Sequence, residues 1–159
     1  MKRMKGLVLA VLLAVSITVL SACGSTALTK PTPSEGQQTV EVTGECQISR
    51  SGDTITVSGT TNLLDGSIVQ VSLDSFNGDV LAAQKYTVSG ESISVDFPVD
   101  AKWTGAVYGH ITCTPKKYGD QPQNVYEQYG SRFENMTGAD VLWNVDGNAA
   151  VFQSEKIDL

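Results

Sequence analysis

The sequence of 159 residues has little of what metal binding and nucleophilic catalysis require. It holds one histidine, His110, and three cysteines, and these do not supply the ligand spacing of a zinc site. The acidic and amide side chains of residues 74–79 and 96–100 do not have the spacing of a calcium loop either. No Gly-x-Ser-x-Gly turn marks a nucleophilic serine. We therefore expect no catalytic residue, no bound metal and no cofactor.

Positive charge is also scarce, with 11 Lys and Arg residues against 17 Asp and Glu. Three of the 11, Lys2, Arg3 and Lys5, lie at the N-terminus, so the chain after residue 22 has eight basic against 17 acidic residues and a net charge of −9. Such a chain lacks the basic stripe that binding to a phosphate backbone requires. The charge balance therefore excludes nucleic acid as an expected partner.

The one long apolar run covers residues 6–20, and its only polar members are Ser16 and Thr18. As a helix this run would extend about 22 Å, which is shorter than the ~30 Å hydrocarbon core of a bilayer. Together with the basic start, the run predicts a signal peptide over residues 1–22. A retained membrane span and a plain signal peptide without lipidation are the alternatives.

The apolar run ends in Leu20-Ser21-Ala22-Cys23, which resembles the lipobox of bacterial lipoproteins. The resemblance implies that the Cys23 thiol is alkylated with diacylglycerol and that the chain is cut before this residue. Two acyl chains anchor a protein durably, whereas one holds it only marginally. We therefore expect the mature protein, residues 23–159, to be lipid-anchored at the cell membrane and to face the extracytoplasmic side.

After Cys23 the composition changes twice. Residues 23–38 are rich in Ser, Thr, Gly and Pro, which predicts a flexible linker with nothing to bury and a reach of at most about 50 Å. From residue 39 to 159, apolar and polar residues alternate between Gly- and Asn-rich turns, which is typical of half-buried strands. The expected strands lie at about residues 39–49, 54–58, 68–74, 80–88, 92–99, 105–114 and 149–157.

One segment departs from the strand pattern. Asp120 as N-cap, Pro122 in the first turn and Gly130 as the stop predict a short helix inserted before the last strand. Together these elements predict an all-β domain over residues 39–159: a two-sheet β-sandwich of about seven strands with one inserted helix. Pro98 places the fifth strand at an edge or an end. A small β-barrel is the alternative.

The stretch Gly59-Thr60-Thr61-Asn62-Leu63-Leu64-Asp65-Gly66 resembles a turn motif of immunoglobulin-like domains in bacterial surface lipoproteins. Tyr129-Gly130 and the later Asn135-Met136-Thr137-Gly138 are similar to the helical insertion of such domains. The resemblance implies an immunoglobulin-like fold and an envelope location. It implies no activity, because these domains mostly lack a defined one.

Cys46 and Cys113 both fall on the inward face of their expected strands. Outside the cytoplasm, where disulfides persist, they form a possible disulfide. The alternative is a pair of buried free thiols that act as small apolar side chains.

Aromatic residues gather around the sixth expected strand and the helix. They could form a binding surface, since exposed Trp and Tyr often anchor partners, or a small core under the long connection. The candidates are Trp103, Tyr108, Tyr126, Tyr129 and Trp143. We expect a lipid-anchored extracytoplasmic binding or interaction domain of the bacterial cell envelope, without catalysis, whose partner is an envelope protein or polysaccharide. An enzyme or enzyme inhibitor acting on an envelope polymer, and a structural spacer domain, are the alternatives.

Overall fold

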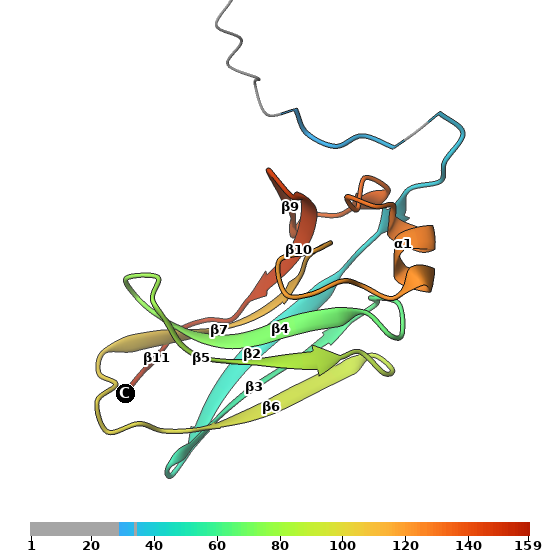
Figure 1. Cartoon of the computed structure of the whole chain (residues 1–159). Coiled ribbons are helices and arrows are strands. Elements are labelled where there is room, and N and C mark those ends of the chain that lie inside the picture. Colours follow the sequence, from blue (N-terminus) through green and yellow to red (C-terminus); the bar gives the residue numbers. More distant parts are fainter. Residues whose placement is uncertain (1–28, 34) are drawn as a thin grey trace, which may run out of the picture.

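The structure is a computed structural model that describes residues 29–33 and 35–159 (Figure 1). The expected signal peptide and Cys23 lie outside these residues. In the described residues, no helix is long and apolar enough to span a bilayer. The elements in chain order are β1 (Val40–Glu41), β2 (Gly44–Ser51), β3 (Thr54–Thr61), β4 (Ile68–Ser75), β5 (Val80–Thr87), β6 (Ser92–Pro98), β7 (Ala106–Cys113), α1 (Gln123–Tyr129), β8 (Met136–Thr137), β9 (Val141–Asn144), β10 (Gly147–Gln153) and β11 (Ile157–Asp158).

The strands form two main sheets that pack face to face, so the predicted all-β sandwich is confirmed. One sheet has the order β2-β3-β6, and the other has the order β5-β4-β7-β10-β9 with β11 also paired to β7. With β2 to β7 and β10 taken in turn as strands A, B, C, C′, E, F and G, the sheets are ABE and C′CFG. This is an immunoglobulin-like arrangement with a C′ strand beside C.

Period-two alternation explains which side chains fill the core between the sheets. Ile55 and Val57 of β3 and Val69, Val71 and Leu73 of β4 are fully buried. The residues between them on β3 are only partly covered. Burial of an aliphatic side chain of this size contributes about 1.5–3 kcal/mol, so these alternating positions carry much of the fold's stability. The alternation predicted from the sequence is confirmed for β3. On β4 the three inward residues are confirmed, but Ser72, which was predicted to face outward, is also buried.

The structure has more strands than the seven predicted, because two expected strands are each divided. The first expected strand breaks between β1 and β2, since β1 turns away to pair in parallel with β8. Asn62 holds this break: its side-chain amide donates to Glu41 O at 2.9 Å and its Oδ1 accepts from Thr43 N at 2.8 Å. The last expected strand is divided into β10 and β11, and the short strands β8 and β9 were not predicted.

The helix lies where it was predicted, but its N-terminal cap is different. Asp120 does not cap α1, since Pro122 occupies the position before it and no side chain bonds to the free N–H groups. The preceding residue, Gln121, is buried and fastens the insertion to the larger sheet. Its Oε1 accepts from Ile68 N, and its Nε2 donates to the carbonyls of Ile68 and Thr114, each at 2.8 Å. The predicted stop at Gly130 is confirmed, where φ is 87°.

The expectation that the linker has nothing to bury is wrong at Pro31, although its described neighbours are exposed or only partly buried. Pro31 is buried. Together with Lys30 and Pro33 it lines one cavity with Met136 of β8 and Val141 of β9. Proline loses little conformational entropy on burial, which makes it suited to such a contact. The N-terminal segment therefore lies against the end of the sandwich where β8 and β9 begin (Figure 1).

Candidate functional site

The five aromatic candidates do not form one surface. Tyr129 is buried, and Trp103, Tyr108 and Tyr126 are partly buried. Trp143 on β9 is the exposed member, with 43% of its surface accessible. The sequence therefore grouped residues that the fold distributes between core and surface.

Tyr126 and Tyr129 form a small core beneath the insertion. The Tyr126 hydroxyl donates to Pro115 O at 2.7 Å, and the Tyr129 hydroxyl accepts from Leu64 N at 2.8 Å. The Tyr129 ring meets Phe133 edge-on, with 5.5 Å between ring centroids. Burial raises the pKa of the Tyr129 phenol. Both tyrosines thus hold the insertion in place, which is the alternative that the sequence left open for them.

Two further exposed apolar side chains lie next to Trp143 on the β9–β10 hairpin. Leu142 is 59% exposed and Val145, in the turn, is 62% exposed. We call Leu142, Trp143 and Val145 the hairpin surface. Single exposed apolar residues need no explanation, but three among four consecutive residues make a patch, and patches mark interaction sites.

The turn of this hairpin is well ordered by hydrogen bonds. Asp146 N donates to Asn144 Oδ1 at 2.8 Å, and Arg132 Nη2 donates to Val145 O at 3.1 Å. Gly147 has φ of 143°, and a Cβ there would lie 2.3 Å from Arg132 O, so only glycine fits. Sequence reasoning did not find this hairpin, although Asp146-Gly147 is a turn signal that could have indicated it.

A cavity of about 400 Å³ lies at the root of the hairpin. Val141 and Asn148 line it from β9 and β10, and residues 30–33 close it from the N-terminal side. Asn148 is buried, and its Nδ2 donates to Phe133 O at 3.0 Å and Met136 O at 3.3 Å, while its Oδ1 has no partner. The cavity thus joins the N-terminal segment to the base of the hairpin surface.

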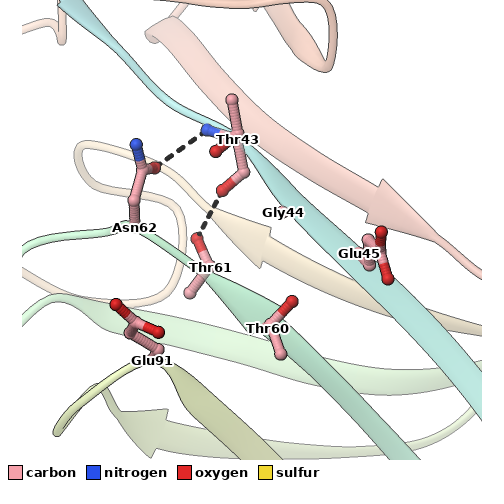
Figure 2. A pocket seen from close by; sticks show the side chains of 7 residues that line it. All are labelled: Thr43, Gly44, Glu45, Thr60, Thr61, Asn62 and Glu91. Atoms are coloured by element: carbon pink, nitrogen blue, oxygen red, sulfur yellow. Dashed lines mark hydrogen bonds between the residues drawn. The ribbon is translucent and has the colours of Figure 1, made fainter.

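A second depression, of about 350 Å³, lies beside the break between β1 and β2 (Figure 2). Its lining is polar: Thr43, Gly44, Glu45, Thr60, Thr61, Asn62 and Glu91. Asn62 and Thr61 are occupied by hydrogen bonds to the backbone of Thr43. Two carboxylates remain to accept hydrogen bonds, but no aromatic ring lines the depression to stack on a sugar. Its polar residues are accounted for by the strand break.

His110 lies on the outer face of the larger sheet, as predicted from its alternation with the inward residues of the same strand. Its Nδ1 is 2.9 Å from Asp74 Oδ2, and the two side chains are 18% and 20% exposed. The contact does not have the geometry of a hydrogen bond, and His110 Nδ1 is left without a hydrogen-bond partner. Ser72 is paired opposite His110 on β4, but no hydrogen bond joins its hydroxyl to the imidazole. Among the described residues, no cluster of His, Cys, Asp or Glu could hold a metal ion.

Cys46 and Cys113 are free thiols, so the possible disulfide is not present. Cys46 Sγ lies 3.4 Å from Gly109 O, whereas Cys113 is four residues further along β7 and donates toward Ile68 O at 3.7 Å. Gly109, which lies beside Cys46, and Cys113 are therefore about 13 Å apart along β7. A disulfide needs Cα atoms within about 7 Å. The prediction that both cysteines face inward was right. The alternation of inward and outward residues, however, does not determine where along the sheets the two cysteines lie.

Both thiols should react with iodoacetamide in denaturant without any reductant. In the native protein at neutral pH they should react slowly, because burial raises the pKa of Cys46 to about 11 and that of Cys113 to about 12. The thiolate is the reactive form, so native labelling of the more exposed Cys46 should accelerate as pH rises toward 11. Mass spectrometry of the labelled protein measures this. If the thiols could be labelled in denaturant only after reduction, Cys46 and Cys113 would be joined by a disulfide after all.

Comparison of the chain with protein-family models, curated proteins and solved structures finds no match.

Proposed function

We propose that this protein is a lipid-anchored, extracytoplasmic interaction domain of the bacterial cell envelope, with no catalytic role. The proposed anchor is Cys23, which follows the lipobox-like residues Leu20-Ser21-Ala22. The proposed interaction surface is the hairpin surface of Leu142, Trp143 and Val145. Exposed tryptophan beside aliphatic residues is the composition that binding surfaces favour.

The observation that carries the proposal is the group of three exposed apolar side chains on the β9–β10 hairpin. Elsewhere in the described residues, the large exposed apolar side chains are Phe76 and Val80. A spacer domain has no need of such a patch, which exposes apolar area to water at a cost in solubility. An enzyme would need a nucleophile or acid–base pair in a cleft, and neither the polar depression nor the His110–Asp74 contact offers one with a hydrogen-bonded partner in reach. Binding through the hairpin accounts for the patch directly.

A photo-reactive amino acid placed at position 143 should crosslink in intact cells, since the proposed surface is occupied there. The matched control is position 76, because Phe76 in the β4–β5 turn is 72% exposed but lies at the other end of the sandwich. We expect adducts from position 143 and few from position 76, measured by mass shift after purification. Equal labelling at the two positions, or none at 143, would contradict the proposed surface.

A further inference from the structure

We propose that the hairpin surface binds the lipid bilayer to which the protein is anchored, with Leu142, Trp143 and Val145 lying in the headgroup region. This inference rests on the proposed lipid anchor and names the partner of the proposed interaction surface. It makes the hairpin a second, non-covalent contact with the same membrane.

The first argument is the short length of chain between the anchor and the hairpin. Residues 30–33 line the cavity at the hairpin's root, together with Val141 and Asn148. Only six residues, 24–29, lie between Cys23 and Lys30, so even when fully extended the chain from Cys23 to Lys30 spans at most about 25 Å. The anchor therefore keeps this end of the domain close to the membrane. Its maximum distance from the membrane is about half of what a free linker up to residue 38 would allow.

The second argument is the position of the hairpin relative to the rest of the domain. β9 and β10 lie at the end of the sandwich where the N-terminal segment runs, while the C-terminus lies at the other end (Figure 1). The other exposed apolar pair, Phe76 and Val80, lies at the far end, where Phe76 N donates to Ala106 O. Of the two apolar tips, only the β9–β10 tip is on the side of the tether.

The third argument is charge. The segments that meet at this end are residues 29–33, 35–41, 115–117 and 130–147, since β1 pairs with β8. They carry four basic residues, Lys30, Lys116, Lys117 and Arg132, against five acidic ones, Glu35, Glu41, Glu134, Asp140 and Asp146. The chain after residue 22 has a net charge of −9, so these segments carry little of the excess negative charge that an anionic lipid surface repels.

The chemistry of the side chains fits the bilayer interface. Tryptophan places an apolar ring and an N–H donor where the apolar and wet regions meet, which is why it is enriched at this depth. Leu142 and Val145 would lose exposed apolar area beside it. Such a contact would be weak for a free domain, but the tether makes it intramolecular and so raises its effective concentration.

The test uses the lipidated mature protein, residues 23–159, in phosphatidylcholine vesicles with and without brominated lipid, which quenches nearby tryptophan. The protein has two tryptophans, so Trp143→Phe removes the hairpin reporter and leaves Trp103, which precedes β7 at the far end. We expect wild type to show a quenched, blue-shifted component that Trp143→Phe lacks. Phe76→Trp added to Trp143→Phe supplies an exposed reporter at the far end, and its emission should not be quenched.

Flotation of the same samples separates the two levels of the proposal. Protein that floats with vesicles while Trp143 stays unquenched would overturn the hairpin contact and leave the anchor standing. Protein that does not float would overturn both. Trp143 that is shielded from brominated lipid and crosslinks to a second copy would assign the patch to self-association, which also overturns the bilayer contact. Because Trp143 is exposed, its replacement leaves the fold intact and the comparison interpretable.

Discussion

Cys23→Ala should move the protein from the membrane fraction to the soluble fraction, or leave it as an uncleaved precursor. Each buried methylene contributes about 0.8 kcal/mol, so two acyl chains hold the domain far more firmly than three half-exposed side chains on a hairpin can. Loss of the thiol removes both chains at once. The expected result is complete loss of incorporated radiolabelled fatty acid, together with retention of the signal peptide or release of the domain.

The other two cysteines provide the control for this experiment. Cys46→Ala and Cys113→Ala should keep the label and the membrane location, because these thiols are covered by the sandwich and lie on strands. Unchanged labelling and membrane association of Cys23→Ala would refute the lipoprotein proposal. That result would instead favour a retained membrane-spanning segment or another means of attachment to the membrane. The hairpin alone should not hold the domain in that variant, since its apolar contact lacks the tether that makes it effective.

The local pattern of the sequence was enough to predict most of the fold. Alternation of apolar and polar residues depends on the period of a strand, and turn residues such as Asn77 and Gly78 depend on backbone conformation, so both signals are short-range. These signals predicted the seven strands of the sandwich and the helix stop at Gly130. They also predicted that Pro98 marks a sheet edge or a strand end. Both hold, since β6 is an edge strand and Pro98 is its last residue.

What could not be predicted depends on contacts between distant segments. The break after β1 requires Asn62 to bond to the backbone of Glu41 and Thr43, some twenty residues away. The separation of Cys46 from Cys113 depends on the relative position of the two packed sheets. The alternation of inward and outward residues does not determine that position. Pro31 is buried where the N-terminal segment shares a cavity with the distant residues Met136 and Val141. Each of these is a tertiary contact that overrides a correct local expectation.

The candidate site shows the same division. Trp143 was chosen as an aromatic residue near the helix, but its exposure comes from its place on the edge strand β9, which pairs with β10 on one side only. Leu142 and Val145 were not chosen, because a four-residue strand is too short for an alternating pattern to be recognised. The residues that matter for binding were therefore separated from those that matter for packing only by the fold itself.

Tyr129→Ala should lower the free energy of unfolding by about 3–5 kcal/mol, because it removes a fully buried ring and leaves a cavity. Tyr129 is 1% exposed and packs edge-on against Phe133. Its hydroxyl also accepts the Leu64 N–H, which would be left without a partner. For a domain of this size the change corresponds to a fall in Tm of roughly 12–25 °C. Thermal and denaturant unfolding of the purified protein measure both quantities.

Two variants separate the ring's contribution from that of its hydroxyl and from any role in binding. Tyr129→Phe keeps the ring and should cost only about 1–2 kcal/mol, the penalty for one unsatisfied buried N–H. Trp143→Ser alters an exposed residue and should change the unfolding free energy by about 0.5 kcal/mol or less, while abolishing the lipid-quenched fluorescence. If Tyr129→Ala were as stable as wild type, the ring would not be part of the core. The insertion's aromatic residues would then return as candidates for the interaction surface in place of the hairpin.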